Sequence, residues 1–312
     1  MDESRWSRRS VLKAIPAIAL GRTQAVHGRQ GLWKWSSGSE MPRTKVPQQA
    51  ADCHFHVYDA RFPVDPKAEL RPADATVDDY LSFRKRIGTS RGVLVQPSTY
   101  GLDNRLLLES LSKFGPAVRG VAVVNTSVSG EELKRMNEAG VRGIRFNLVQ
   151  AGATRLDMVE PLSRRIADLG WHIQVNATAD QIEAAKETWL RTACPIVFDH
   201  LGRLPAPQGT GHPAFGTISD LLHRGKAWVK VSGFYIDSKV GAPAYADSVA
   251  VAGAYVKAAP ERLVWGSDWP HPTETVKPND AILLDLLAEC VPGEVMRNRI
   301  LVDNAAKLYG FV

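Results

Sequence analysis

The stretch Trp171-His172-Ile173-Gln174-Val175-Asn176-Ala177 alternates strictly between apolar and polar side chains. Successive residues of a β-strand point to opposite faces of its sheet, so the stretch predicts a strand with one apolar and one polar face. A strand of an open, doubly wound sheet would need apolar residues on both faces. The alternation therefore favours a sheet closed into a barrel, with the polar face lining the interior.

Seven further apolar runs, separated by segments with helical periodicity, extend this pattern along the chain. Strands that alternate with helices indicate a parallel sheet, and eight of them indicate a (β/α)8 barrel, the TIM-barrel architecture. The 312 residues, 44% of them hydrophobic, are enough for one such domain of about 250 residues. We expect the strands at residues 51–58, 91–98, 118–125, 141–148, 171–177, 195–201, 227–234 and 263–268.

The first predicted strand contains two histidines, in Asp52-Cys53-His54-Phe55-His56. Strand parity places His54 and His56 on the interior face, and Cys53 and Phe55 against the surrounding helices. Two imidazoles on one face can share a metal ion or a substrate oxygen, although a pair of structural core histidines gives the same pattern.

Two more polar residues lie at the ends of later predicted strands, His200 at the end of the sixth and Asp268 at the end of the eighth. The carboxyl ends of all strands of a (β/α)8 barrel meet at one mouth, where catalytic residues of this architecture lie. We therefore predict that His54, His56, His200 and Asp268 form one catalytic centre.

The beginning of the chain has a different composition from the rest. Residues 7–13, Ser-Arg-Arg-Ser-Val-Leu-Lys, resemble a twin-arginine export signal and precede an apolar run far shorter than the ~20 residues that span a bilayer. We predict a signal peptide at 1–30, a linker at 31–49 and the barrel at 50–312. The protein would then be periplasmic, without a membrane anchor once the signal is removed; a disordered basic tail is the alternative.

The net charge of +6 also belongs to this region. Residues 1–45 hold nine Lys or Arg against three Asp or Glu, which leaves thirty residues of each sign in the remainder. A neutral body gives no support for nucleic acid as a partner, so a small-molecule substrate is expected, and no oligomeric state is predicted. The three cysteines cannot all pair and lack metal-type spacing, so no disulfide framework is expected.

Six motifs between residues 50 and 312 resemble those of the amidohydrolase superfamily, in the branch that contains pyrone-dicarboxylate lactonases and sugar-lactone hydrolases. They are DCHFHVYD at 52–59, VQPSTYGLDN at 95–104, RGIRFNL at 142–148, FDHLGRLP at 198–205, RLVWGSDWPHP at 262–272 and RILVDNAAKLYGF at 299–311. The resemblance implies a hydrolase that opens the lactone ring of a small acidic or sugar-derived substrate.

The resemblance also implies the role of each residue in the catalytic centre. Asp268 would be the general base that acts on water, and the three histidines would surround the scissile carbonyl. A carboxylate that is ionised but has a raised pKa can take a proton from water, while imidazole donors stabilise the developing oxyanion.

The resemblance leaves the cofactor open between none and a single divalent metal ion. Metal-dependent members carry a histidine at the end of strand five, where this chain has Asn176, and strand four supplies no bridging lysine or carboxylate. A binuclear centre is therefore not expected, although His54, His56 and Asp268 could hold one ion weakly. The pyrone lactonases of the branch work without metal.

Arg145 resembles the arginine that clamps a substrate carboxylate in the branch, and the guanidinium fork suits such an anion. An ion pair with a neighbouring strand is the alternative. The second carboxylate-binding arginine of the branch follows strand seven, where residues 232–239 contain none. The other predicted substrate-binding residues are Ser98, Tyr100, Gln174 and Asn176.

Three other functions remain open from the sequence. They are a metal-dependent decarboxylase of the same superfamily, a lactone isomerase that uses the same base, and a non-catalytic binding barrel. Asn176 argues against the first, because a tightly bound ion would need a histidine there. The complete set of histidines with Asp268 argues against the last, since a binding protein needs no general base.

Overall fold

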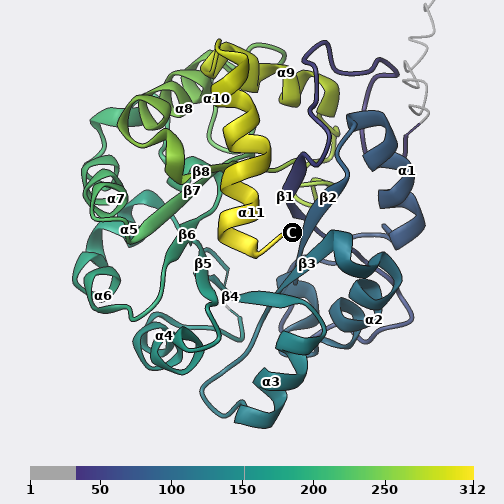
Figure 1. Cartoon of the computed structure of the whole chain (residues 1–312), viewed down its shortest axis with the longest axis vertical. Coiled ribbons are helices and arrows are strands. Elements are labelled where there is room, and N and C mark those ends of the chain that lie inside the picture. The colour runs from purple at the N-terminus through teal and green to yellow at the C-terminus, as the bar shows by residue number, and fades with distance from the viewer. Residues whose placement is uncertain (1–32, 151) are drawn as a thin grey trace, which may run out of the picture. The chain divides into compact units, whose positions relative to one another are not determined.

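The computed structural model describes residues 33–150 and 152–312, so the predicted signal peptide lies outside the described residues. Eight parallel strands form one sheet in sequence order, and Figure 1 shows them as a ring enclosed by helices. The predicted (β/α)8 barrel is confirmed. The strands are β1 (Ala51–Phe55), β2 (Arg91–Val95), β3 (Val118–Ala122), β4 (Val141–Asn147), β5 (His172–Asn176), β6 (Ile196–Phe198), β7 (Ala227–Val231) and β8 (Leu263–Trp265).

The helices pack their apolar faces against the outside of the ring. The first helix begins at a capping box, in which the side chains of Thr76 and Asp79 each accept a hydrogen bond from the other residue's backbone N–H. It ends at Gly88, which has the left-handed conformation. No helix in the described part of the chain is long and apolar enough to cross a membrane. The helices are α1 (Val77–Ile87), α2 (Arg105–Phe114), α3 (Gly130–Glu138), α4 (Val159–Ala167), α5 (Ala179–Ala184), α6 (Lys186–Arg191), α7 (Pro213–His223), α8 (Ala246–Ala258), α9 (Asp280–Cys290), α10 (Glu294–Asn298) and α11 (Asn304–Tyr309).

An apolar cluster fills the barrel interior at the end away from the predicted site. Helix α11 crosses this end of the ring, and the C-terminus lies at its centre (Figure 1). Tyr309 and Phe311 pack there against inward-facing side chains of the strands. The strand members of this cluster are Ala51, Cys53, Val93, Val95, Val121, Val197, Trp228 and Val264. The interior is therefore a packed core at one end, which leaves the opposite mouth for polar residues.

The predicted orientation of Cys53 toward the helices is wrong, because this residue belongs to the interior cluster. The register of β1 against β2 shifts between Asp52 and Phe55, which breaks the simple alternation of faces. Phe55 obeys the prediction and stacks on Tyr80 of α1, with ring centroids 3.5 Å apart. The irregularity lets both Cys53 and His54 contribute to the interior.

The observed strands end earlier than predicted wherever a candidate site residue follows. The eighth strand was expected to reach residue 268 but ends at Trp265, and Asp268 itself has a φ of 64°. His200, after β6, has a φ of 49°. Left-handed backbone cannot continue a strand, so these two residues lie in the loops at the mouth.

The barrel closes between β1 and the chain after β8 without a regular ladder. The Asp268 backbone N–H donates to the His54 carbonyl at 2.8 Å, and the His56 N–H donates to the Trp269 carbonyl at 2.8 Å. Gly266 makes this approach possible, because a Cβ on it would lie 2.7 Å from His54 Cβ and 2.8 Å from His54 N. Closure thus places Asp268 beside both histidines.

Replacing Gly266 with alanine should therefore force β1 and β8 apart. We expect Gly266→Ala to lower the free energy of unfolding by about 1–3 kcal/mol, as overpacking does, measured by urea denaturation. Gly253→Ala is the matched control, because a Cβ at this position of α8 would meet no atom within 4 Å. That variant should be at least as stable as the wild type. Equal stability of the two variants would contradict the proposed steric role of Gly266.

Candidate active site

The structure brings the four predicted catalytic residues together at the mouth of the barrel. Asp268 Oδ1 lies 3.5 Å from His54 Nε2 and 3.5 Å from His56 Nε2. His200 Nε2 lies 3.9 Å from the same oxygen. The two strand-one imidazoles meet at 3.2 Å between their Nε2 atoms. One carboxylate oxygen therefore faces three imidazoles.

A cavity of about 300 Å³ opens above this cluster. Its wall includes His56, His200 and Asp268, whereas His54 is fully buried beneath them. Three of the predicted substrate-binding residues also line it, namely Ser98, Arg145 and Asn176. This size suits a small cyclic substrate rather than a polymer.

The other two predicted substrate-binding residues, Tyr100 and Gln174, do not line this cavity. The Tyr100 hydroxyl accepts a hydrogen bond from the Asp59 backbone N–H at 2.8 Å and is held in the loop behind the wall. Gln174 is fully buried under the floor, where its amide donates to Asp199 at 3.1 Å. Strand parity predicted the correct face of the barrel for Gln174, but the side chain lies below the cavity floor rather than in the cavity wall.

Arg145 forms the ion pair that was one of its two alternatives. Its Nε lies 3.7 Å from Asp199 Oδ2, in a residue that follows β6. The side chain also lines the cavity, and its Nη1 donates a long hydrogen bond to the Gln96 carbonyl at 3.5 Å. The clamp on a substrate carboxylate stays a prediction.

A second arginine in the cavity wall, Arg203, was missed by the sequence analysis. It forms an ion pair with Asp237 at 2.7 Å and lies 3.4 Å from the Asn176 side-chain oxygen. Its position in the FDHLGRLP motif, three residues after His200, was the available signal. The segment 232–239 after β7 contains no arginine, and Arg203 reaches the cavity wall from the loop after β6.

Two buried charged residues under the floor were also missed. Asp199 is 1% exposed and Lys230, in β7, is 0% exposed. Lys230 Nζ donates to Gln174 at 2.7 Å and lies 3.5 Å from Asp199 Oδ1. A lysine in the apolar stretch Ala-Trp-Val-Lys-Val was the sequence signal, because a buried ammonium needs a partner.

Tyr235, in the loop after β7, holds the second oxygen of the catalytic carboxylate. Its hydroxyl donates to Asp268 Oδ2 at 2.6 Å and lies 2.9 Å from His271 Nδ1. His271 Nε2 in turn lies 3.0 Å from Asp280. No role was predicted for His271, which contacts the Tyr235 hydroxyl in the structure. Asp268 Oδ2 is thereby fixed, and Oδ1 is left to face the imidazoles.

The expected raised pKa of Asp268 is wrong. Burial by itself raises the pKa of this carboxyl, but the nearby His200, His56 and His54 side chains outweigh it and hold the pKa well below its usual range. Burial lowers the pKa of His54 and also that of His200. At neutral pH the site therefore holds an ionised carboxylate between uncharged His54 and His200 side chains.

His54, His200 and Asp268 are the residues of this cluster that could hold a metal ion. One donor atom each from His54, His200 and Asp268 lie within 4.8 Å of one another. Arg145 and Lys230 both pair with Asp199, so Asp268 supplies the one negative charge of this donor set. A divalent ion there would keep one uncompensated positive charge in a buried region, which is unfavourable. This cluster does not fit a tightly held divalent ion.

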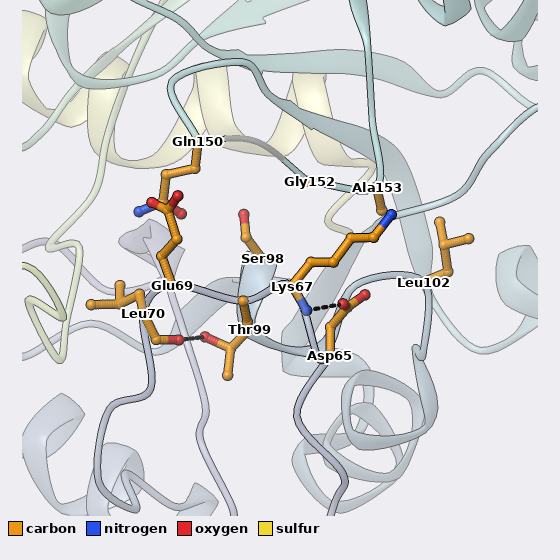
Figure 2. Close-up of a pocket in the computed structure, with 11 residues that line it drawn as sticks. Asp65, Lys67, Glu69, Leu70, Ser98, Thr99, Leu102, Gln150, Gly152 and Ala153 are labelled. Atoms are coloured by element: carbon orange, nitrogen blue, oxygen red, sulfur yellow. Dashed lines mark hydrogen bonds between the residues drawn. The ribbon is translucent and has the colours of Figure 1, made fainter.

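A second hollow of about 260 Å³ adjoins the catalytic cavity (Figure 2). The two share a wall of Leu70, Ser98, Thr99 and Gln150. Figure 2 shows the Lys67 side chain extending across this hollow toward Ala153. Residues of the loops that follow β2 and β4 therefore line both hollows.

Comparison with known proteins gives relatives over nearly the whole barrel. The chain is 32% identical to a 2-pyrone-4,6-dicarboxylate hydrolase of Comamonas testosteroni, over 89% of this chain and 96% of that protein. It is 33% identical to a 4-sulfomuconolactone hydrolase of Rhizobium radiobacter, over 86% of this chain and 92% of that protein. A solved structure from Agrobacterium tumefaciens, 28% identical, superposes with a TM-score of 0.82 over 87% of this chain and 99% of its own.

A protein family matches the same region. Residues 51–311, from the start of β1 to the penultimate position of the chain, match the amidohydrolase family. This range contains every residue of the cluster around Asp268. The match agrees with the barrel and with the relatives above, so the chain belongs to the amidohydrolase family.

Proposed function

We propose that the protein hydrolyses the lactone ring of a small substrate that carries an acidic group. The observation that carries this proposal is the ionised Asp268 carboxylate, with one oxygen facing three imidazoles on the floor of a small cavity. The two relatives named above, both hydrolases of cyclic esters by name, support the same reaction class.

The reaction follows from this arrangement. Asp268 Oδ1 takes a proton from water while the water oxygen attacks the ring carbonyl carbon. Imidazole N–H groups at the floor stabilise the negative charge that develops on the carbonyl oxygen. Collapse of the tetrahedral intermediate breaks the ring C–O bond, and the leaving alkoxide takes the proton back from Asp268. The product is an open-chain hydroxy acid, and the carboxylate is regenerated.

Two guanidinium groups favour an acidic substrate. Arg145 and Arg203 both line the cavity, and each is paired with a carboxylate of the protein, Asp199 and Asp237 respectively. Guanidinium groups bind carboxylates with two parallel hydrogen bonds, which would orient the ring as well as hold it. Among the described residues, the terminal nitrogens of Arg145 make one long hydrogen bond, to the Gln96 carbonyl at 3.5 Å, so Arg145 is the main candidate for this contact.

Asp268→Asn removes the proposed base but keeps the shape of the side chain. We expect kcat for lactone hydrolysis to fall by roughly 100-fold or more, with an unchanged circular dichroism spectrum. Asp220→Asn is a suitable control, since Asp220 forms an exposed pair with Arg224 on α7. Near-wild-type turnover by Asp268→Asn would refute the assignment.

The dependence of the rate on pH should reflect the direction of the pKa shifts. The lowered pKa of Asp268 keeps it ionised as the pH falls, and the lowered pKa values of His54 and His200 keep both uncharged. With a substrate that does not titrate in this range, kcat/KM measured by pH-stat should stay level from about pH 8 to about pH 6.5, the ordinary pKa of histidine. A loss of rate that already begins above pH 7 would contradict the lowered pKa values of His54 and His200.

Arg145 distinguishes an acidic substrate from a neutral one. Arg145→Met keeps much of the stem and removes the charge, so it should cost about 2–4 kcal/mol in kcat/KM for an acidic lactone. A neutral lactone of the same ring size should lose much less. Arg145→Lys should also impair the acidic substrate, because it lacks the two-pronged geometry. Equal losses for both lactones with a lower Tm would identify Arg145 as only the ion-pair partner of Asp199.

A further inference from the structure

Lys230 is a buried cation for which the proposed reaction has no use. It lies in the middle of β7, with its side chain fully buried beneath the floor of the cavity. Besides Gln174 and Asp199, its Nζ approaches His54 Nδ1 at 3.3 Å. It therefore touches the catalytic cluster from the side opposite the substrate.

His56 does not by itself decide which nitrogen of His54 carries the hydrogen. Its Nδ1 lies 2.7 Å from the backbone carbonyl oxygen of Val95. A carbonyl oxygen can only accept, so His56 Nδ1 must carry a hydrogen. Nε2 of His56 lies 3.2 Å from His54 Nε2 and 3.5 Å from Asp268 Oδ1, so it is within reach of both.

Lys230 decides which nitrogen of His54 carries the hydrogen. An ammonium can only donate, and Lys230 Nζ lies 3.3 Å from His54 Nδ1. Burial, followed by the charge of Lys230, lowers the pKa of His54 and keeps the ring uncharged. Nδ1 of His54 is therefore the acceptor.

Two groups compete for His54 Nδ1, and only one of them suits an acceptor. Lys230 Nζ and Asp199 Oδ1 both lie 3.3 Å from it. A carboxylate would need a hydrogen on Nδ1, whereas an ammonium donates to its lone pair. Asp199 Oδ1 has no hydrogen-bond partner within the described residues, which agrees with an Nδ1 that carries no hydrogen.

We propose that Lys230 is a positioning residue that fixes His54 as the tautomer with hydrogen on Nε2. His54 then presents an N–H rather than a lone pair toward Asp268 Oδ1, 3.5 Å away. The other tautomer, bonded to Asp199, would set a lone pair against an ionised carboxylate. The effect of Lys230 on the rate rests on the proposed function, whereas the tautomer of His54 does not.

The tautomer can be measured directly in the full-length protein labelled with 15N-histidine. Two-bond 1H–15N correlation spectra distinguish the two tautomers from each other and from the imidazolium, and the His54→Gln variant assigns the His54 signals. We expect wild-type His54 to carry its hydrogen on Nε2. A hydrogen on Nδ1, or an imidazolium near neutral pH, would overturn the proposal without any variant of Lys230.

Lys230→Met tests the cause. It removes the ammonium while preserving much of the volume, so His54 should change to the tautomer with hydrogen on Nδ1, bonded to Asp199. We expect kcat for a hydrolysed lactone to fall by about 10–100-fold, as loss of an outer-shell partner does, with little change in KM. If this variant does not fold, the wild-type spectrum still decides the tautomer.

Lys226→Met is the matched control, because Lys226 precedes the same strand but donates to the Leu190 and Thr192 carbonyls, away from the site. It should leave the His54 signals and kcat unchanged. An unchanged His54 tautomer in folded Lys230→Met would refute the positioning role even if activity fell. A protein with the expected tautomers that hydrolyses no lactone would instead refute the proposed function and leave this inference standing.

Discussion

The close approach of β1 to the chain after β8 is the constraint on which the rest of the site depends. Two backbone hydrogen bonds close the barrel there, from Asp268 to the His54 carbonyl and from His56 to the Trp269 carbonyl. They are short because Gly266 has no side chain to hold the strands apart. The catalytic carboxylate therefore lies beside the strand-one histidines as a direct consequence of how the ring closes.

Three charged side chains and one amide form a buried set at and beneath the cavity floor. Asp199 is surrounded by Lys230, Arg145 and the Gln174 amide, and all four side chains are almost fully buried. Burying one such charge alone would be very costly, so each depends on its partners. Two cations thus flank a single carboxylate, and Lys230 places a hydrogen-bond donor behind His54. The chemistry above the floor therefore depends on Lys230 and Asp199, which do not line the cavity.

The loops after the strands carry most of the other residues of the site. Asp268 has left-handed backbone, and its two oxygens have different partners: Tyr235 holds Oδ2, while Oδ1 faces the imidazoles. Arg145 faces the cavity from β4, and Arg203 faces it from the loop after β6. Because loop residues change without disturbing the packed ring, substrate preference and catalysis can be set separately on this architecture.

The sequence by itself determined the barrel, because strand alternation and helical periodicity are local patterns that each segment carries on its own. It also placed His54, His56, His200 and Asp268 at one mouth, since every parallel strand of a barrel points its carboxyl end the same way. Only the tertiary structure decided four features. They are the inward position of Cys53, the burial of Gln174 below the cavity floor, the presence of Arg203 in the cavity wall and the lowered pKa of Asp268. Each of these depends on a register shift or on neighbours distant in sequence, such as Lys230 behind His54 and Tyr235 behind Asp268. A local sequence pattern cannot reveal those contacts, because they form only when the barrel closes.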